Sequence, residues 1–465
     1  MLMRETALMQ IEKISVTGLF GIFDHTIPIN TKEGITIIHS LNGFGKTSTL
    51  RLLDGLFSSR YSVIEGMPFN KFVVTFDNGN SIEIIQDHST SKGKSKSISL
   101  NLSYFEMGGE VKTASLSSAK NNRSKRELLN DAIDNIPELR KLGSSSWIYS
   151  ITGEGGERFS TEEVMDRFED RLPPDMRNII SGDPDWLIEL KQNVKVRLIE
   201  SQRLLNTVSN RISRRYDKEM VMLSAVSAYS EELSIMIKRK LEEYGNTSQL
   251  IDRTFPIRVI KHGSSQGFTD EEIQEQLTEL EKNRSRLVAV GLLDGKHSSD
   301  LEISHQKFDE STKNLLSVYI SDMKEKISVF DDIIEKMELF EKLVNQKFSY
   351  SQKTMNFDKE KGFVFNISSD VETEKLNPPS PSDLSSGEQH EVVLLYELLF
   401  KVQKHSLVLI DEPELSLHVS WQQQFLKDLQ EVRKLTQINM LIATHSPDII
   451  QDRWDLTVEL KGSQV

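Results

Sequence analysis

A short segment near the N-terminus combines glycines with a lysine and a hydroxyl side chain in a spacing suited to holding phosphate. It reads Ser40-Leu-Asn-Gly-Phe-Gly-Lys-Thr47, follows an apolar run at 35–38 and precedes a helix-like stretch at 48–57. In that setting the loop amides and the helix N-terminus face an anion together, Lys46 reaches the phosphates and Thr47 binds Mg²⁺. The sequence therefore predicts a phosphate-binding loop between a buried strand and a helix.

This loop departs from the usual G-x-x-x-x-G-K-[ST] pattern at one position, because Ser40 stands in place of the first glycine. A side chain there is expected to strain the turn or to alter slightly how phosphate is held. The expected ligand is ATP with Mg²⁺. The loop residues expected to contact it are Asn42, Gly43, Gly45, Lys46, Thr47 and Ser48.

A second set of residues with chemical potential follows an apolar run at 407–410, which is typical of a buried strand. Asp411 ends this run, and Glu412 and Pro413 come next. An aspartate at the end of a buried strand can hold Mg²⁺, and the adjacent glutamate can orient and polarise an attacking water. The alternative is a strand that simply ends in a solvated pair of carboxylates.

The segment Leu384-Ser-Ser-Gly-Glu-Gln389 precedes that strand and resembles the LSGGQ signature of ABC-type ATPases. Taken alone it reads as a helix cap, because serine followed three residues later by glutamate caps helices. With Lys46 and Asp411 in this order, the chain is similar to the ABC superfamily. The resemblance implies that Ser385, Gly387 and Glu388 bind ATP held by a second subunit, which gives a homodimer with ATP between the heads or a higher homo-oligomer.

Two further site residues are assigned through this resemblance. His445 follows an apolar run at 440–443 and resembles the switch histidine that contacts the γ-phosphate. Gln202 follows a strand candidate at 194–199 and resembles the Q-loop glutamine that senses Mg²⁺ and the attacking water. A lone histidine after a strand is usually structural, so both assignments depend on the other motifs. Catalysis is thus expected from Glu412, His445 and Lys46.

The elements that must position these residues predict an α/β fold in three parts. Residues 1–205 are expected to form the N-terminal lobe of an ABC-type ATPase head, a mixed sheet with the P-loop and Q-loop. Residues 206–375 are expected to form a helical, coiled-coil-like insertion. Residues 376–465 are expected to form the C-terminal lobe with the signature, the Asp-Glu strand and the switch histidine.

Within these parts, local patterns predict several elements. Asp77-Asn-Gly-Asn80 predicts a hairpin between two strands, and residues 126–190 are expected to be mainly helical. Breaks at Phe255-Pro256 and at 295–299 divide the insertion into about three helices. A coiled-coil arm and an ordinary helical subdomain both remain open. The apolar seam that predicts helix pairing consists of Ile273, Leu277, Leu280 and Leu287, and of Ile320, Met323, Ile327, Phe330, Ile334 and Met337.

The long separation of Lys46 from Ser385 and the segment Glu414-Leu-Ser-Leu-His418 resemble the SMC-like and OLD-type branch, since transporters have an aspartate where this chain has His418. The resemblance is closest to stand-alone OLD-like ATPases of bacterial anti-phage systems, such as those of Septu and PARIS. It implies a sensor or scaffold that controls a separately encoded nuclease or toxin. Only a short segment follows Pro447, so a nuclease domain of the chain's own is not expected.

Composition narrows the remaining alternatives. The chain has no cysteine, a net charge of −13 and no apolar run near the roughly 20 residues that cross a bilayer, so we expect a cytoplasmic protein without a membrane partner. Basic clusters at 92–96, 120–126 and 211–218 leave DNA open as a further partner. The resemblance to anti-phage ATPases leaves a phage protein open as well. An SMC-like DNA-repair or DNA-organising ATPase is the main alternative, followed by a transporter subunit and an inert binding module.

Overall fold

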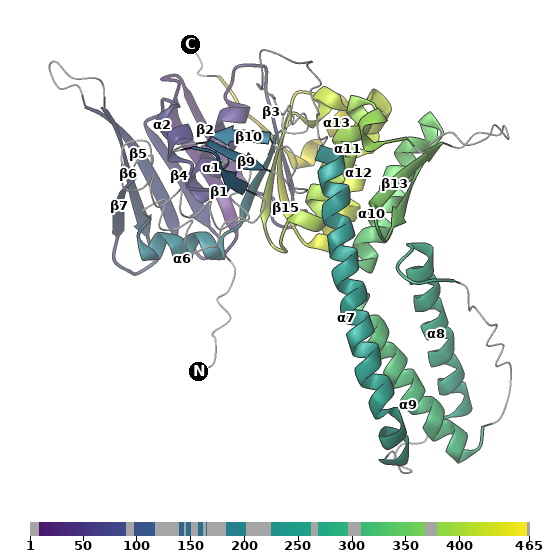
Figure 1. The fold of residues 1–465 in the computed structure, drawn as a ribbon. Coiled ribbons are helices and arrows are strands. Elements are labelled where there is room, and N and C mark those ends of the chain that lie inside the picture. Colours follow the sequence, from purple (N-terminus) through teal and green to yellow (C-terminus); the bar gives the residue numbers. More distant parts are fainter. Residues whose placement is uncertain are drawn as a thin grey trace. The chain divides into compact units, whose positions relative to one another are not determined.

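The computed structural model describes residues 9–89, 97–116, 139–143, 146–149, 157–160, 164, 183–200, 225–261, 268–295, 308–367 and 379–462. These residues form two compact units (Figure 1). Unit 1 comprises Met1–Met222 and Val402–Val465, and unit 2 comprises Leu223–Lys401. The three basic clusters at 92–96, 120–126 and 211–218 lie outside the described residues.

The first sheet of unit 1 has six antiparallel strands in the order β2-β1-β4-β5-β6-β7. Side chains of β4 alternate between buried and more exposed positions, as expected of a sheet with one face on the core. The predicted hairpin at Asp77–Asn80 is confirmed, and Gly79 supplies its left-handed residue at φ 81°. The strands are β1 (Ile11–Leu19), β2 (Phe23–Pro28), β4 (Lys71–Phe76), β5 (Ser81–Ser89), β6 (Ser97–Phe105) and β7 (Lys112–Leu116).

The second sheet of unit 1 is parallel, with the strand order β11-β14-β15-β3-β16. Its inner strands are almost continuously apolar because both faces of a parallel sheet are covered. All its strands end at one edge, so residues that follow different strands meet there. The strands are β3 (Ile35–His39), β11 (Val196–Glu200), β14 (Leu407–Asp411), β15 (Asn439–Thr444) and β16 (Thr457–Glu459).

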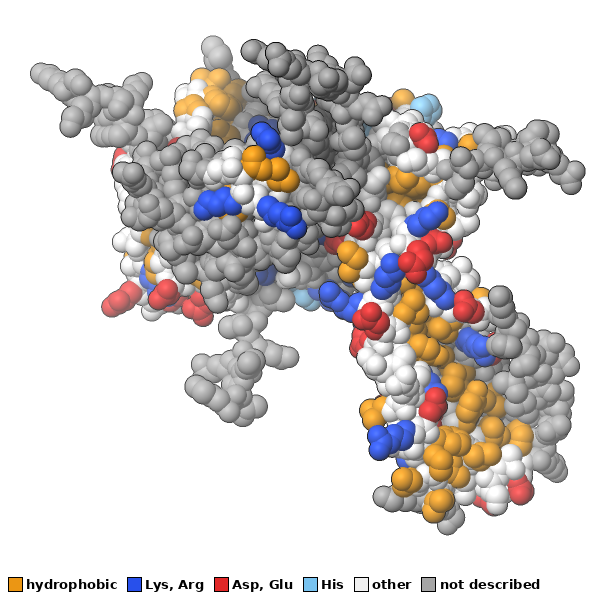
Figure 2. Space-filling model, viewed as in Figure 1, with side chains coloured by type: hydrophobic (Ala, Val, Ile, Leu, Met, Phe, Trp, Pro, Cys, Tyr) orange, Lys and Arg blue, Asp and Glu red, His pale blue; other side chains and the backbone are white. Residues whose placement is uncertain are grey.

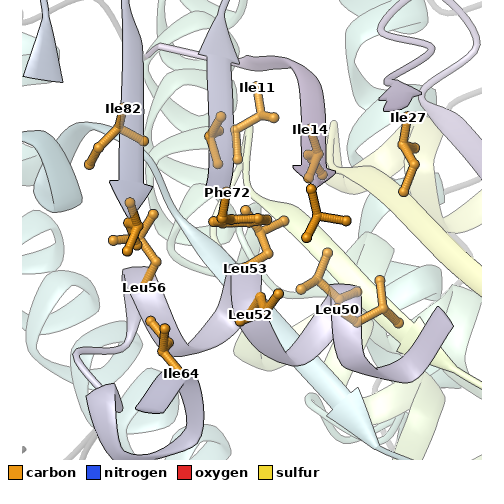
Figure 3. Packing of buried hydrophobic residues seen from close by; sticks show 14 of the residues in the cluster. Ile11, Ile14, Ile27, Leu50, Leu52, Leu53, Leu56, Ile64, Phe72 and Ile82 are labelled. Atoms are coloured by element: carbon orange, nitrogen blue, oxygen red, sulfur yellow. The ribbon is translucent and has the colours of Figure 1, made fainter. Parts of the chain in front are cut away.

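Helix α1 (Lys46–Phe57) joins the two sheets through its leucines. Leu50, Leu53 and Leu56 point at the antiparallel sheet, where they meet residues such as Ile14 and Phe72 (Figure 3). Burying each such side chain contributes about 1.5–3 kcal/mol, so this helix and the loop that precedes it are firmly anchored. The other helices of unit 1 are α2 (Tyr61–Glu65), α6 (Asp185–Asn193), α12 (Val419–Thr436) and α13 (Pro447–Ile450).

The expectation of helices at 126–190 is wrong for its middle part. A three-stranded antiparallel sheet lies there instead, made of β8 (Leu139–Lys141), β9 (Ser146–Tyr149) and β10 (Glu157–Ser160). Its buried residues include Trp147 and Phe159. Strands of three or four residues are too short to show a period of two, so the sequence does not reveal them. Apart from 164 and α6, the rest of this stretch lies outside the described residues.

Unit 2 is largely helical. Its longest helix, α7, has 37 residues and therefore extends about 55 Å. Helices α7 and α8 both pack against α9, whereas α10 packs on a two-stranded hairpin. The mixed-sheet α/β head with a helical insertion, as the sequence predicted, is confirmed. The elements are α7 (Ala225–Lys261), α8 (Asp270–Ala289), α9 (Glu310–Ile327), α10 (Ile334–Phe348), β12 (Lys353–Asp358), β13 (Gly362–Ile367) and α11 (Ser386–Tyr396).

The predicted helix break at Pro256 is wrong, because α7 continues through this residue. Proline lacks the amide that would donate to the carbonyl four residues earlier, and neighbouring side chains add other hydrogen bonds to this turn. The Thr254 hydroxyl donates to the carbonyl of Ile251 at 3.1 Å, and Arg258 Nη2 donates to the same carbonyl at 2.8 Å. Arg258 also pairs with Asp322 on α9, which fixes this part of the helix against its neighbour.

Most of the predicted apolar seam is buried, whereas Leu277 and Met323 are half-buried, and the seam does not lie on one helix. Ile320 and Ile327 belong to α9, Phe330 lies in a 3₁₀ turn, and Ile334 and Met337 belong to α10. Apolar residues spaced alternately three and four positions apart show which side chains are buried, but not whether a single helix carries them. A short turn between two helices can preserve the same spacing. The described part of the insertion thus contains four helices before the hairpin rather than about three.

The surface of helices α7 and α9 carries both charged pairs and exposed apolar side chains (Figure 2). Lys326 pairs with Asp252 at 2.6 Å and so links α9 to α7, whereas Leu250, Ile257 and Ile260 of α7 are exposed. No helix among the described residues is both long and apolar enough to cross a membrane.

Candidate functional site

The segment between β3 and α1 forms the predicted loop. Gly43 and Gly45 have left-handed backbone conformations, with φ values of 87° and 85°. A Cβ at Gly45 would also lie 2.5 Å from Cδ2 of Leu19, so both conformation and space require glycine there. At Gly43 a Cβ would meet nothing within 4 Å, which leaves the turn open on that side. The amides at the start of α1 have no side-chain cap and can receive an anion.

Ser40 does not strain the loop. Among the described residues it is not one of those with positive φ, so its backbone conformation suits any L-amino acid. Its hydroxyl donates to the carbonyl of Leu41 at 3.1 Å. The strain expected from the missing first glycine is therefore absent.

Lys46 is buried and points back into its own loop. Its Nζ donates to the carbonyls of Ser40 and Leu41 at 2.9 and 3.3 Å. These neutral acceptors stabilise a buried cation less than phosphate oxygens do, so the ammonium group is suited to meet an incoming anion.

His25 supports the same loop from the antiparallel sheet, where it is buried on β2. Its Nε2 lies 2.7 Å from the carbonyl oxygen of Phe44, and the ring of Phe44 lies 5.3 Å from that of Phe23. Sequence reasoning missed His25, because only the pairing of distant strands brings it to the loop.

The Thr47 hydroxyl donates to Oδ1 of Asp411 at 2.9 Å, which joins residues 364 positions apart in the chain. Burial raises the pKa of Asp411 to about 6; the Thr47 hydrogen bond acts to lower it, and the charge of Glu412 acts to raise it. Destabilised carboxylates of this kind favour a nearby cation.

These residues fit Mg²⁺ bound together with phosphate. Magnesium usually takes one or two protein oxygens and completes its shell with water and phosphate oxygens. Thr47 and Asp411 offer two oxygens 2.9 Å apart. The described residues contain no cluster of three or more histidine or carboxylate side chains that could hold a metal ion.

Glu412 adopts a left-handed conformation at φ 43° and ψ 57°. Its amide donates to the carbonyl of Ala443 at 2.8 Å, which ties it to the end of β15. A non-glycine residue in this region is strained by about 1–3 kcal/mol, and such strain concentrates at functional positions. The turn places the carboxylate beside Asp411, at the edge where the parallel strands end.

His445 follows β15 directly, and its side chain is 42% exposed. Its Nδ1 lies 2.9 Å from Oε1 of Glu414 and 4.0 Å from Oε1 of Glu412. Unit 1 therefore brings together Lys46, Thr47 and Asp411, and it places Glu412 near His445. Gln202 lies outside the described residues, so its predicted role stays a prediction.

The signature residues belong to unit 2, where Ser385 caps helix α11. The predicted domain boundary at 376 thus falls inside this unit, and α11 packs against α7 and α10. Ser385 and Glu388 form a reciprocal capping box, with the amide of Ser385 donating to Oε2 of Glu388 at 2.8 Å.

Glu388 is held by its own unit. Lys353 Nζ and Ser351 Oγ donate to its two oxygens at 2.8 and 2.7 Å. Burial acts to raise the pKa of Glu388, but the hydrogen bonds from Lys353, Ser351 and Ser385 outweigh it and leave the pKa below its usual range. The carboxylate shapes the loop, whereas Ser385 and Ser386 are exposed. Nucleotide contacts by Ser385, Gly387 and Glu388 stay predictions.

Residues 230–451 match the family described as "AAA domain, putative AbiEii toxin, Type IV TA system". The matched region is slightly less than half of the chain and contains the signature, Asp411, Glu412 and His445. With the phosphate loop of unit 1, this match supports an ATPase of the ABC superfamily. Among curated proteins, none matches the chain significantly.

Several solved structures are similar at low identity. One is the Smc head domain with an extended coiled coil from Pyrococcus furiosus, bound to the C-terminal domain of ScpA, at 12% identity and TM-score 0.31 over 95% of this chain and 91% of that chain. The SMC head domain from Thermotoga maritima has 10% identity and TM-score 0.30 over the same shares. The recombination mediator RecF has 11% identity and TM-score 0.26 over 98% and 99%.

Proposed function

We propose that the protein is an ABC-type ATPase that hydrolyses ATP. The observation that carries this proposal is the 2.9 Å contact between Thr47 and Asp411, which unites the phosphate loop with the carboxylate strand. Glu412 and His445 follow at the same edge of the parallel sheet, because they come after β14 and β15. A chance helix cap or a solvated pair of carboxylates explains none of this convergence.

The chain's own residues have distinct tasks in this reaction. The amides of the loop and Lys46 bind the β- and γ-phosphates, and Thr47 and Asp411 hold Mg²⁺, which neutralises phosphate charge when bound. Glu412 orients a water and accepts its proton as the water oxygen bonds to the γ-phosphorus. The bond from that phosphorus to the bridging oxygen breaks, which leaves ADP and phosphate.

The proposal includes a head-to-tail homodimer. The signature presents Ser385 and Ser386 at the exposed start of α11. Their exposed hydroxyls can donate to a phosphate bound to another copy of the chain. Each of two ATP sites then uses the loop of one chain and the signature of its partner.

Glu412→Gln tests the catalytic assignment. We expect turnover to fall at least about 100-fold while ATP affinity is retained, because the amide keeps the shape of the site but cannot accept the proton. ATP should also hold the variant as a dimer in light scattering. Glu459→Gln is a matched control, since Glu459 ends β16 of the same sheet and is 58% exposed. Unchanged turnover in Glu412→Gln would contradict the proposal.

We further propose that this ATPase acts in the cytoplasm as a sensor or scaffold for a separately encoded nuclease or toxin in anti-phage defence. The description of the matched family, which names a toxin–antitoxin system, supports this. Co-purification with the products of neighbouring genes, with and without ATP, tests it. A nuclease or toxin retained in one nucleotide state is the expected result. DNA-stimulated turnover without such a partner would instead favour a DNA-repair ATPase.

A further inference from the structure

Glu414 is a buried carboxylate that the catalytic scheme does not use. It lies in the 3₁₀ turn Pro413–Ser416, two residues after Glu412, and its side chain is only 5% exposed. Its Oε1 accepts from the amide of His445 at 2.8 Å and lies 2.9 Å from His445 Nδ1. Two atoms of one residue thus meet a single carboxylate oxygen, which fixes both the backbone and the ring of His445.

The competing carboxylate is too distant to hold this ring. Glu412 Oε1 lies 4.0 Å from His445 Nδ1, beyond hydrogen-bond distance. The second oxygen of Glu414, Oε2, is buried and has no hydrogen-bond donor among the residues that the structure describes. His445 is therefore the main hydrogen-bonding partner of the Glu414 side chain. Burying a carboxylate with so few donors costs folding free energy, which points to a functional role for this residue.

The geometry also selects one form of the histidine. Oε1 of Glu414 already accepts from the amide of His445, so an acceptor faces Nδ1 at 2.9 Å and suits a proton on that nitrogen. Nε2 is then the ring nitrogen that Glu414 does not engage. The ring is 42% exposed, so without this contact it could rotate about its side-chain bonds.

We propose that Glu414 is the positioning residue of the switch histidine: it holds His445 with Nδ1 protonated and leaves Nε2 for the terminal phosphate. This inference rests on the proposed ATPase function. It assigns a role to the second glutamate of Asp411-Glu-Pro-Glu414, whereas the catalytic scheme uses only the first.

Turnover measurements on paired variants test this role. Glu414→Ala should lower kcat about 10- to 100-fold with little change in KM, as expected when the support of a site residue is lost. Once His445→Ala is present, adding Glu414→Ala should lower turnover no further, because both changes remove the same interaction. Independent, multiplying losses would overturn the proposal, since they indicate a merely structural role.

Two conservative variants separate the effect of side-chain length from the effect of charge. They also test the proposal if Glu414→Ala does not fold. Glu414→Gln keeps the length of the side chain and an oxygen acceptor, so we expect turnover within about threefold of the original chain. Glu414→Asp keeps the charge but withdraws the oxygen by one methylene, so its turnover should fall further. If Asp supports turnover better than Gln, charge rather than positioning matters and the proposal fails.

Nitrogen-15 spectra of the imidazole rings give a readout independent of activity. The His445 signal, identified by its loss in His445→Ala, should show protonated Nδ1 in the original chain and in Glu414→Gln. It should shift toward protonated Nε2 in Glu414→Asp. An unchanged tautomer in Glu414→Asp would overturn the positioning role even if ATP is hydrolysed. A tautomer change together with full turnover in Glu412→Gln would instead refute the ATPase scheme alone.

Discussion

Helices α1 and α11 both follow a short loop, yet the two helix starts are built in opposite ways. At α1 the amides have no side-chain cap, and the buried cation of Lys46 lies beside them. At α11 Ser385 caps the amides, and the carboxylate of Glu388 already occupies the helix N-terminus. A helix N-terminus attracts anions in either case. The first helix start can hold phosphate by itself, whereas the second is already satisfied.

In the proposed composite site, this difference restricts nucleotide binding to the loop before α1. Unit 1 offers a cation and two oxygens suited to Mg²⁺, and we propose that these provide the affinity. Unit 2 adds only exposed hydroxyls on a rigid frame fixed by Lys353 and Ser351. We therefore expect the loop at α1 to govern ATP binding, and the loop at α11 to govern dimer formation and turnover.

The largest effect on ATP binding should come from Lys46→Ala. Removing the cation that faces the phosphates should weaken ATP binding about 1,000-fold, equivalent to about 4 kcal/mol. Calorimetric titration with ATP and Mg²⁺ measures this. Lys71→Ala is the control, because Lys71 is an exposed lysine of the same unit that pairs with Glu83. If Ser385→Arg weakens binding as strongly as Lys46→Ala, the contrast between the two helix starts is wrong.

The next prediction concerns the packing of α11 against α10 and its contribution to stability. Lys347 of α10 and Glu391 of α11 form an ion pair in which both side chains are 1% exposed. Lys347→Met should cost about 3–5 kcal/mol of unfolding free energy, because it leaves a buried carboxylate without its cation. Adding Glu391→Leu should recover most of that loss. Urea denaturation measures both.

A matched pair in the same unit provides the control for this effect. Lys401 and Glu232 are 25% and 32% exposed, so Lys401→Met should change stability by less than about 1 kcal/mol. Equal losses in Lys347→Met and Lys401→Met would mean that burial of the first pair does not matter. That outcome would also mean that the buried ion pair does not hold α11 firmly against α10.

Ser385→Arg should separate binding from turnover. A bulky cation at this exposed cap should leave the affinity of each chain for ATP unchanged but lower turnover about 100-fold, or about 3 kcal/mol. Mixing this variant with Lys46→Ala should restore about a quarter of the original turnover, because half of the dimers then contain one intact site of two. No recovery on mixing would exclude the head-to-tail arrangement.

Sequence reasoning predicted the parts of this site that lie at the ends of elements. The loop at Lys46 and the carboxylate at Asp411 follow buried strands, and continuous apolar runs reveal such strands. The cap at Ser385 was also readable, because a capping box is a local pattern. These features depend only on neighbours along the chain.

What could not be predicted depends on contacts between distant segments. His25 supports the loop only because β2 pairs with β1 beside it. Pro256 lies in a helix whose turn is also held by hydrogen bonds from Thr254 and Arg258, and Arg258 pairs with Asp322 on α9. The short strands around Trp147 carry too few residues to show a period. In each case tertiary contacts override the local preference, and one sequence contains no record of them.

Asp411→Asn should produce the smallest effect, and it tests whether unit 1 is arranged for a cation. Burial raises the pKa of Asp411 from 3.8 to about 6, so the folded chain binds its proton more tightly than the unfolded chain does. Stability contributed by this group therefore falls as pH rises from about 4 to about 6. Asparagine keeps an acceptor for Thr47 without the charge. In the absence of nucleotide, it should stabilise the chain by about 1–2 kcal/mol at pH 7, after allowance for partial exposure.

The pH dependence and the ligand dependence of this stabilisation make the prediction specific. Thermal denaturation should show the variant and the original chain converging below about pH 3, where Asp411 is protonated in both folded and unfolded states. Adding ATP with Mg²⁺ at pH 7 should reverse the order, because the cation binds the carboxylate but not the amide. A variant that is less stable than the original chain at pH 7 without nucleotide would show that Asp411 serves the fold. A variant that is more stable than the original chain at pH 7 without nucleotide would show that burial of the Asp411 carboxylate is unfavourable until Mg²⁺ binds.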